Sequence, residues 1–481
     1  MTKRDEYAEQ VIRKGDEGSR LLEEMCQQTC DGARFVSYEG PEGYMVRGLR
    51  LPRDHKVVVH AVGGNPSTKS FPDYVQSAMS NLKEQAALIG ANLVSIINVL
   101  DTHGTDDLSD VLRYREVLGN EALANHISVI NGEYAILGAM INPAIVANVN
   151  LIGVSIAKPG RNGSLQRFNH HYGYFDHEGM LVTGNGDGVG TKVEVYARAE
   201  KFALGIDDLL AMILDDSIKR GAIPRLVASL LEAYQQIPIP NMRATLQRRA
   251  AEMGVLGILQ TERVGQRIVG WRPGVRAYNL SGAAICTIAD DRIAHPLVPE
   301  EGDYILAVTS TENPRANGIT DRRKVPARLW GESWHLNPDP FVQEYLAYLI
   351  SPSTVLFPAY RELVDKRVAT ALYHNSGGAW EKKFGHPIAQ RGLYAALHDI
   401  PPPNEMDKFV MEQSGTEIRN AYGKWPMGVD GFVTTRDPEE AQRVLQSHGL
   451  EGHQIGRLIK DTEDKAGISF TAYDGTMISF S

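Results

Sequence analysis

The fold and the chemistry of this chain are best predicted from one stretch, Gly186-Asp187-Gly188-Val189-Gly190-Thr191-Lys192, which follows an apolar segment at Met180–Thr183 typical of a strand. Three glycines within five positions leave backbone N–H groups open to an anion. The lysine can meet phosphate oxygens, and the aspartate can hold a divalent cation. The spacing matches neither the Walker phosphate loop nor the dinucleotide-binding glycine motif. A plain glycine-rich turn is the alternative, but the flanking charges favour a nucleotide site formed by Gly186, Asp187, Gly188, Gly190, Thr191 and Lys192.

Carboxylates follow this stretch on a helix predicted from about Asp207 to Lys219. Residues one or two helical turns apart share a face, so Asp208 lies on the same face as one member of the pair Asp215 and Asp216. Stacked carboxylates repel unless a cation lies between them, and magnesium prefers carboxylates, water and substrate phosphates. We therefore predict that magnesium is held by Asp187, Asp208 and Asp216; a solvated acidic helix face is the alternative.

Strands and helices alternate on both sides of the glycine stretch, which predicts an α/β fold. The segment from 55 to 160 and the segment from 180 to 290 show the same order of strand, polar turn, helix, strand, helix and strand, so we predict an internal repeat. Glu133 and Glu262 then occupy matching places at the ends of predicted strands, where a carboxylate can reach a metal or a ligand. In the first copy, Gly63–Lys69 replaces the charged glycine stretch and lacks its acid.

The domain organisation follows from this repeat and from a glycine-rich linker at 158–164. We expect an N-terminal helix and turn segment at 1–54 and a degenerate copy of the nucleotide-binding domain at 55–160. The complete copy is expected at 161–297, and a C-terminal α/β domain at 298–481.

Composition excludes several classes of protein. The chain has 481 residues with 50 basic and 59 acidic side chains, a balance that disfavours a dedicated nucleic-acid binder. Its longest apolar runs reach about ten residues, whereas a membrane span needs roughly 20. The first residues are polar and show no secretory signal, so a cytoplasmic location is expected. Three cysteines cannot form a disulfide framework.

The glycine stretch also carries a family resemblance. Asp187–Lys192 resembles the signature loop of the phosphoribosylformylglycinamidine cyclo-ligases, also called aminoimidazole ribonucleotide synthetases. Further segments are similar to family motifs in the same order along about 1–30 and 161–481. They are Gly205–Asp216, similar to a helix ending in Asn-Asp; Gly221–Pro224, similar to Gly-Ala-x-Pro; Arg315–Gly318, at the place of His-Ser-Asn-Gly; and His374–Gly378, similar to His-x-Thr-Gly-Gly.

Departures from the family pattern are concentrated in four places. Gln260-Thr261 stands where the family has two glycines, and Arg315 stands where it has a histidine. Tyr422–Gly428 is two residues longer than the matching family segment, and the family has no counterpart of 55–160. Asn131-Gly132-Glu133 is more similar to the family's Gly-Gly-Glu than Gln260-Thr261-Glu262 is, so either glutamate could serve the site.

The resemblance implies an AIR synthase-like fold that binds ATP between two N-terminal domains, normally those of two subunits. It further implies an ATP- and magnesium-dependent conversion of formylglycinamidine ribonucleotide to aminoimidazole ribonucleotide. Lys192 and the glycine-stretch amides would meet phosphates, while Asp187, Asp216 and a glutamate would hold magnesium. His374 and Asn317 would face the phosphoribosyl substrate; taken alone, His374 is more often structural.

Alternatives and the assembly state stay open at this level. The same fold would suit another ATP- and magnesium-dependent small-molecule phosphotransferase, or a catalytically dead paralogue that still binds nucleotide. We expect either a homodimer or a monomer in which the first copy replaces the partner subunit and packs its sheet against that of the second copy. In that monomer Glu133 would join the single site, and the mirror-image site around Gly63–Lys69 would be inactive.

Overall fold

The structure is a computed structural model that describes residues 3–30, 34–41, 45–63, 71–102, 108–136, 147–158, 172–233, 236–263, 276–310, 313–461 and 466–481. Most of the linker at 158–164 and of the Gly63–Lys69 turn lies outside these residues. The chain divides into two compact units. The first unit holds Met1–Ser37, Arg47–Ala197 and Pro224–Asp290, and the second holds Tyr38–Val46, Arg198–Ile223 and Asp291–Ser481. Among the described residues, every helix is too short or too polar to cross a lipid bilayer.

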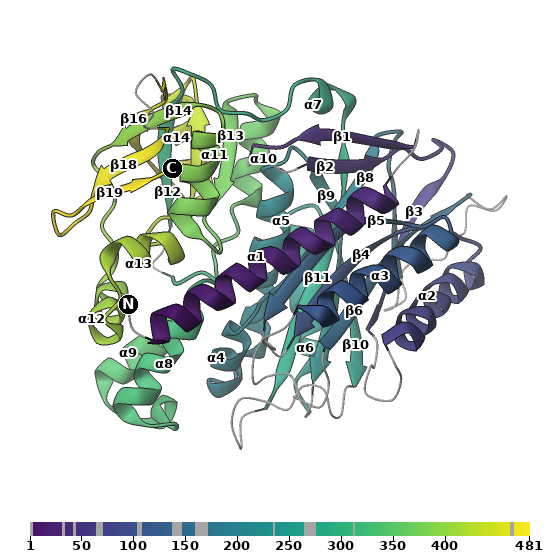
Figure 1. Cartoon of the computed structure of the whole chain (residues 1–481), viewed down its shortest axis with the longest axis horizontal. Coiled ribbons are helices and arrows are strands. Elements are labelled where there is room, and N and C mark those ends of the chain that lie inside the picture. The colour runs from purple at the N-terminus through teal and green to yellow at the C-terminus, as the bar shows by residue number, and fades with distance from the viewer. Residues whose placement is uncertain are drawn as a thin grey trace. The chain divides into compact units, whose positions relative to one another are not determined.

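Helices and strands alternate through the first unit, which confirms the predicted α/β class (Figure 1). One sheet has five strands in the order β5-β4-β6-β3-β7. Its strands are β3 (Lys56–Gly63), β4 (Asn92–Thr102), β5 (Ser128–Ile136), β6 (Ala147–Ala157) and β7 (Tyr172–Asp176). A second sheet has six strands in the order β1-β2-β8-β11-β9-β10. Its strands are β1 (Phe35–Glu39), β2 (Met45–Leu49), β8 (Leu181–Gly188), β9 (Ile223–Ala233), β10 (Leu256–Arg263) and β11 (Tyr278–Ile288).

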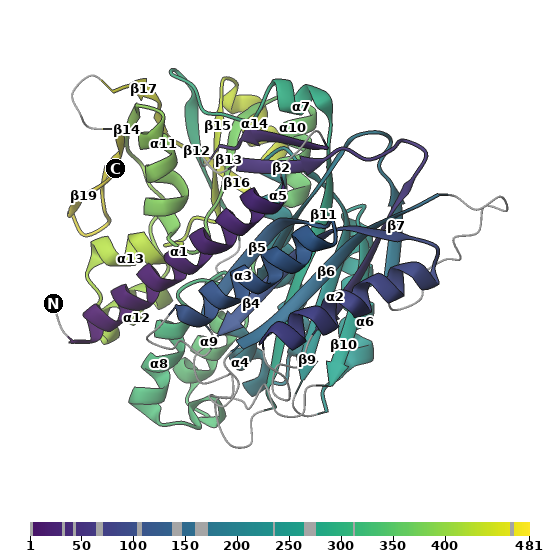
Figure 2. The ribbon, with the colours of Figure 1, turned by 45° about the vertical axis from the view of Figure 1, so that its right-hand side comes forward.

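Three helices lie side by side over one face of the five-stranded sheet, as Figure 1 and Figure 2 show. They are α1 (Lys3–Thr29), α2 (Phe71–Leu88) and α3 (Ser109–Ala124). Apolar residues three and four apart place one stripe of each helix against the sheet. In α1 this stripe includes Leu22, Met25 and Cys26, which share a buried core with Ile96 of β4 and Val129 of β5. The remaining helices of this part of the chain are α4 (Lys192–Arg198), α5 (Gly205–Ile218), α6 (Ile239–Glu252) and α7 (Asp290–Ala294).

The two sheets share one strand order. Strands β5-β4-β6-β3 match β10-β9-β11-β8 position for position. In each sheet the first two strands of this order are parallel, β5 with β4 and β10 with β9. The last two are antiparallel, β6 with β3 and β11 with β8. This shared topology supports the predicted internal repeat, and the duplication itself stays a proposal.

The two sheets pack face to face around one apolar core. The five-stranded sheet contributes Val57, Val59 and Ala61 of β3, Ile97, Ile130, Ile152, Val154 and Phe175. The six-stranded sheet contributes Val182, Leu226, Ala228, Leu230, Ile258, Ala283 and Ile285. All of these side chains are at most 9% exposed. The sheet-against-sheet packing expected for a first copy that replaces a partner subunit is therefore present within this unit.

The second unit contains two four-stranded sheets, in the orders β13-β15-β12-β16 and β17-β14-β18-β19. The strands are β12 (Tyr304–Thr309), β13 (Ala369–His374), β14 (Leu393–Leu397), β15 (Gly431–Thr435), β16 (Glu451–Arg457), β17 (Ile459–Lys460), β18 (Gly467–Thr471) and β19 (Met477–Phe480). The helices are α8 (Ile319–Trp330), α9 (Pro340–Leu349), α10 (Phe357–Asp365), α11 (His386–Gln390), α12 (Glu405–Ser414), α13 (Ile418–Lys424) and α14 (Pro438–Ser447). Side-chain caps start several of them, as Asn404 does when it accepts the Asp407 N–H.

The unit boundaries differ from the expected domain boundaries at one helix. Helix α5 lies in the expected 161–297 domain, yet it belongs to the second unit. The reason is its buried carboxylates, because Asp208 and Asp215 accept hydrogen bonds from Ser353, Leu356 and Phe357 of that unit.

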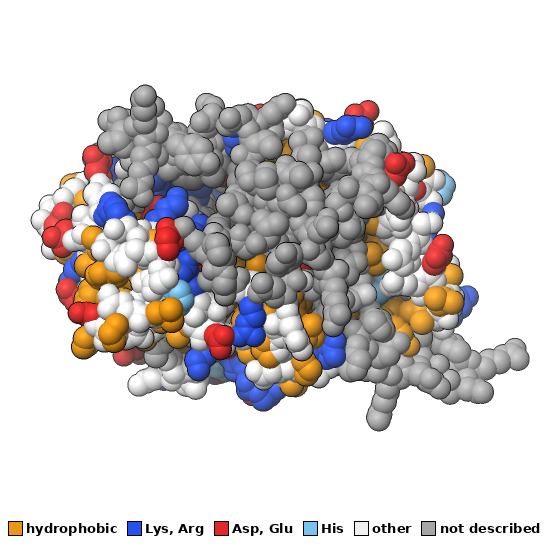
Figure 3. Space-filling view, turned by 90° about the horizontal axis from the view of Figure 1, so that it is seen from below, with side chains coloured by type: hydrophobic (Ala, Val, Ile, Leu, Met, Phe, Trp, Pro, Cys, Tyr) orange, Lys and Arg blue, Asp and Glu red, His pale blue; other side chains and the backbone are white. Residues whose placement is uncertain are grey.

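On the described part of the face drawn in Figure 3, apolar, basic and acidic side chains are interspersed.

A substitution at Gly186 can test how closely the two sheets approach each other. A Cβ atom there would lie 2.9 Å from Cγ2 of Ile97, a contact that real side chains avoid. Gly186→Ala should therefore lower the free energy of unfolding by about 1–3 kcal/mol through overpacking. Chemical denaturation measures this, and a double-mutant cycle with Ile97→Ala should show coupling between the two positions.

Gly188 supplies the matched control. The nearest atoms to a Cβ at that position would be 3.8 Å away, so Gly188→Ala should leave stability within about 0.5 kcal/mol of the original. Equal losses for both glycine variants would contradict the packing argument.

Candidate functional site

The predicted nucleotide stretch lies mostly inside a strand. Strand β8 continues to Gly188, and Asp187 pairs with Gly282 of β11. The Gly186 N–H donates to Oδ1 of Asn131 at 3.0 Å, and the Gly188 N–H donates to Oδ1 of Asp187 at 2.6 Å. The expected binding role of Gly186 and Gly188 through open amides is thus corrected, since protein oxygens already accept these two N–H groups. The part that leaves the sheet is Gly190–Lys192, where α4 begins.

Lys192 and Asp187 differ in their surroundings. Lys192 is fully buried, and its ammonium lies 5.5 Å from the ring centroid of Tyr196. Asp187 is half-buried, so its carboxylate keeps a path to solvent. A phosphate role for Lys192 therefore requires the ligand to enter a desolvated site, where charge-assisted contacts are strong.

The two candidate glutamates do not end their strands. Glu133 lies inside β5 opposite Val99, and Glu262 lies inside β10 opposite Glu232. The side chain of Glu262 is outside the described part of the structure. The five-stranded sheet instead reaches the glycine stretch through Asn131, the first residue of the triad that was singled out for its glutamate. The sequence signal for Asn131 is its side-chain amide, because the amide oxygen can accept a hydrogen bond from a backbone N–H of a strand in the facing sheet.

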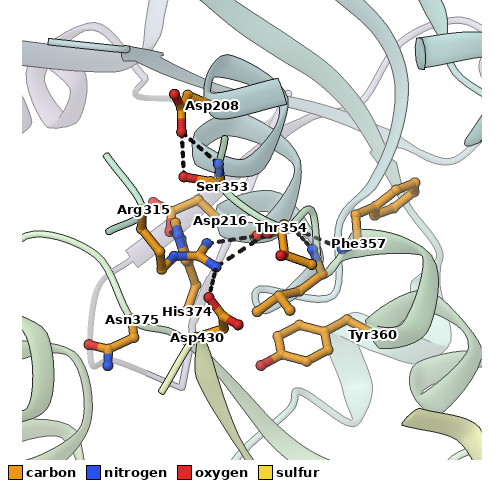
Figure 4. Close-up of polar contacts among 12 residues, drawn as sticks. Asp208, Asp216, Arg315, Ser353, Thr354, Phe357, Tyr360, His374, Asn375 and Asp430 are labelled. Atoms are coloured by element: carbon orange, nitrogen blue, oxygen red, sulfur yellow. Dashed lines mark hydrogen bonds and ion pairs between the residues drawn. The ribbon is translucent and has the colours of Figure 1, made fainter. Parts of the chain in front are cut away.

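Two carboxylates of α5 are used structurally. Asp208 is fully buried and accepts from the Ser353 N–H at 2.9 Å and from the Ser353 hydroxyl at 2.5 Å (Figure 4). Asp215 lies further along the same helix. It accepts the N–H groups of Leu356 and Phe357, at the start of α10, at 2.9 and 2.8 Å. Asp208 is therefore a structural hydrogen-bond acceptor, which corrects its expected role as a magnesium ligand.

Asp216 lies in a cluster of positive and neutral donors. The buried ammonium of Lys219 is 2.6 Å from its Oδ1, and Nδ1 of His374 is 3.0 Å from the same oxygen. Burial raises the pKa of Asp216, but the Lys219 charge and the His374 hydrogen bond outweigh it and hold that pKa well below its usual range. A carboxylate that stays ionised only accepts, so Nδ1 of His374 carries the proton and Nε2 holds the lone pair.

His374 is fully buried, and its Nε2 has no hydrogen-bond partner among the described residues. Burial, together with the nearby charge of Arg315, lowers the pKa of His374 to about 4. The imidazole is therefore neutral at neutral pH. It is better suited to accept a hydrogen bond from a ligand N–H or O–H than to act as a strong base.

Arg315 is the main departure from the family pattern, and it has a structural role. Its buried guanidinium donates to Asp430 at 3.0 Å, to Asp215 at 3.2 Å and to the Thr354 carbonyl at 3.2 Å (Figure 4). Burial lowers the pKa of Arg315, but Asp430 and Asp215 raise it above its ordinary value overall. The backbone of Arg315 has φ of 50°, a left-handed conformation that a non-glycine residue adopts only when its surroundings hold it there.

Asn317 lies next to the His374 segment. Its side-chain amide donates to the Asn375 carbonyl at 3.4 Å, and its own carbonyl accepts from Arg322 at 2.5 Å. Asn317 thus contacts the residue that follows His374, and a substrate role for the two side chains stays a prediction.

The predicted magnesium ligands fit that role unequally. Within the described ranges, no three His, Cys, Asp or Glu side chains gather as a metal site. The carboxylate of Asp208 accepts hydrogen bonds from Ser353, and the charge of Asp216 is compensated by the ammonium of Lys219. Asp187 remains a suitable half-buried carboxylate, and its pairing with Asp216 stays a prediction.

Comparison with known proteins places these residues in context. No protein-family model matches the chain. A Pyrococcus horikoshii phosphoribosylformylglycinamidine cyclo-ligase is 24% identical over 318 residues, covering 64% of this chain and 86% of the relative. One from Thermococcus gammatolerans is 24% identical over 343 residues, covering 68% of this chain and 96% of the relative. This chain is similar in sequence to the phosphoribosylformylglycinamidine cyclo-ligases. The resemblance found in the motifs is thereby confirmed.

Solved structures similar to this chain include Thermotoga maritima PurL complexed with ATP, with a TM-score of 0.39 and 12% identity over 62% of this chain and 43% of that one. They also include the Escherichia coli hydrogenase maturation protein HypE, with a TM-score of 0.37 and 18% identity over 58% of this chain and 79% of that one.

The Asp216–Lys219 pair can be tested by charge removal. Asp216→Asn removes the carboxylate 2.6 Å from a fully buried ammonium, so it should lower the free energy of unfolding by about 3 kcal/mol or more. Lys219→Met should be similarly costly, and the double variant should lose much less than the sum of the two single losses. Additive losses in chemical denaturation would show that the two groups are not coupled.

The buried imidazole predicts a pH dependence of folding. The unfolded chain binds a proton at His374 near pH 6.5, whereas the folded chain binds it only near pH 4. Between these values the unfolded state holds more protons, so stability should fall as pH falls from 6.5 to 4, by on the order of 3 kcal/mol. His374→Gln should remove this slope in denaturation curves measured across that window. The exposed His398 gives the control, since His398→Gln should retain the slope.

Proposed function

We propose that this chain is an ATP-dependent ligase of the cyclo-ligase type, which converts formylglycinamidine ribonucleotide to aminoimidazole ribonucleotide. The observation that carries the proposal is the similarity to cyclo-ligases over 86% and 96% of the length of two of them. The ordered motifs from the glycine stretch to the His374 segment support it. In the proposed reaction ATP transfers a phosphoryl group to the formyl oxygen, an internal nitrogen attacks the same carbon, and phosphate leaves with closure of the ring.

Each group of the site has a proposed part in this reaction. Lys192 and the backbone of Gly190–Thr191 would bind ATP phosphates, and Asp187 would hold magnesium against them. His374 would orient a substrate N–H through its Nε2, because its low pKa makes it a good neutral acceptor. The protein's contribution is then positioning and charge neutralisation.

We propose in addition that the first unit replaces the two-subunit arrangement of N-terminal domains. The support is the shared strand order of the two sheets and their common apolar core. Asn131 supplies the contact from the first copy to the glycine stretch of the second. Whether Glu133 joins the same site stays part of the proposal.

A second candidate is an ATP-dependent phosphotransferase with another small-molecule substrate. The observation that favours it is Arg315, whose side chain is buried between Asp215 and Asp430 where the family has a histidine. A guanidinium held this way cannot offer the same contacts to a substrate as an imidazole.

The decisive experiment measures ADP release with and without formylglycinamidine ribonucleotide during a magnesium titration. Stimulation by this substrate is expected, together with a product that carries a free aromatic amine. Asp187→Asn should lower magnesium-dependent turnover tenfold or more, since a charge-assisted contact is worth roughly 1.5–3 kcal/mol. The exposed Asp54 is the control, and Asp54→Asn should not change turnover.

Three other outcomes would redirect the proposal. No stimulation by this substrate, with stimulation by another phosphate acceptor, would favour the phosphotransferase. Nucleotide binding without any ADP release would favour a catalytically dead paralogue. Unchanged turnover of Asp187→Asn at every magnesium concentration would remove Asp187 from the metal site.

A further inference from the structure

Two side-chain amides cross between the sheets of the first unit in a reciprocal way. Oδ1 of Asn131, on β5, accepts the Gly186 N–H of β8 at 3.0 Å. Oε1 of Gln260, on β10, accepts the Ala61 N–H of β3 at 3.1 Å. Strands β5 and β10 hold matching places in the two strand orders, and so do β3 and β8. Each copy therefore gives one side-chain acceptor to the other copy, as happens at an interface between two like subunits.

A third contact marks where the two copies meet. Asn150 of β6 pairs with Gly63 of β3, and Ser281 of β11 pairs with Gly188 of β8. The Asn150 amide donates to the Ser281 hydroxyl at 3.0 Å, and both side chains are buried. A residue on the axis of a twofold interface contacts its own counterpart. The contact therefore indicates that Asn150 and Ser281 are counterparts on the matching strands β6 and β11, with Gly63 and Gly188 as counterparts beside them.

The two accepted N–H groups are equivalent in this register. Ala61 stands two residues before Gly63, and Gly186 stands two residues before Gly188. Both N–H groups belong to buried residues. A buried N–H that loses its acceptor costs free energy, so each of the two crossing contacts stabilises the strand that receives it.

The two acceptors also occupy equivalent positions along the chain. Asn131 stands two residues before Glu133, and Gln260 stands two residues before Glu262. Each takes the place of the first glycine in the family's Gly-Gly-Glu. Glycine has no side chain and cannot make this contact, so both departures from the family motif have the same structural use here, a hydrogen bond to the other copy.

The two contacts differ in the residue that follows the accepted N–H. Gly186 is followed by Asp187, whose half-buried carboxylate accepts the next backbone N–H at 2.6 Å. Ala61 is followed by Val62, which is buried in the apolar core shared with the helices α1, α2 and α3. Of the two contacts, the one made by Asn131 therefore adjoins a side chain that can bind a cation, and the other does not.

We propose that Asn131 is a positioning residue for the binding of a magnesium nucleotide. By accepting the Gly186 N–H, its amide oxygen holds the end of β8 in the conformation in which Asp187 meets the cation. The inference rests on the proposed function, because it takes the nucleotide to bind at Asp187 and Gly190–Lys192. It deepens that function by giving the first copy a defined part in the nucleotide site of the second.

The test measures binding of the non-hydrolysable β,γ-methylene analogue of ATP, with magnesium, to the full chain by calorimetry. Asn131→Ala should weaken binding about tenfold, because the lost hydrogen bond lowers the population of the competent conformation and the apparent affinity falls by the same factor. Without magnesium, Asn131→Ala and the original chain should bind the analogue equally, since Asn131 acts through the residue that meets the cation.

Gln260→Ala is the matched control. It removes the equivalent acceptor, so it should shift the midpoint of chemical denaturation as much as Asn131→Ala does. Its affinity for the magnesium analogue should nevertheless equal that of the original chain, because no acid adjoins the Ala61 contact. Asn131→Asp is the conservative variant. Its carboxylate accepts the same N–H, so it should bind the magnesium analogue at least as tightly as the original chain does.

Several results would overturn the positioning role. They are the absence of saturable binding to the original chain, unchanged binding by Asn131→Ala, equal weakening by Gln260→Ala, and the same weakening without magnesium. The proposed reaction is judged separately. Tenfold weaker binding by Asn131→Ala, in a chain that leaves formylglycinamidine ribonucleotide unchanged, would support the positioning role and reject the reaction. Cyclo-ligase activity with the same KM for ATP in Asn131→Ala and in the original chain would reject the positioning role and support the reaction.

Discussion

The face-to-face packing of two sheets around one apolar core is the constraint on which the first unit depends. Side chains from β3 to β7 interdigitate with side chains from β8 to β11, so neither sheet has an independent hydrophobic interior on that side. Where the backbones come closest, only glycine fits, as at Gly186 beneath Ile97. The residue most easily taken for part of a phosphate loop is therefore first a packing residue, and a nucleotide role must be built from the residues that follow it.

Buried charge organises the second unit in a similar way. Arg315 is held between Asp215 and Asp430, while Asp216 is held by Lys219 and His374. Burying such groups is costly unless each is paired, so the pairs fix the segments that carry them. One consequence is the neutral imidazole of His374.

The candidate site residues are divided between the two units. The first unit presents Asp187 near the end of a strand that is paired within its sheet, and Lys192 at the start of the helix that follows. The second unit presents a buried acceptor, Nε2 of His374. Arg315 and the Tyr422–Gly428 segment mark where this chain departs from the cyclo-ligase motifs.

The sequence by itself determined the α/β alternation, the positions of most helices and strands, the cyclo-ligase resemblance and the matching order of the two copies. These depend on local periodicity and on short motifs, which are written in consecutive residues. Tertiary structure alone decided that the Gly186 amide is taken by Asn131, that Asp208 binds Ser353, and that Asp216 is neutralised by Lys219 and His374. Each of these outcomes depends on a partner far away in the chain or on burial, and neither distance nor desolvation can be computed from spacing along a sequence.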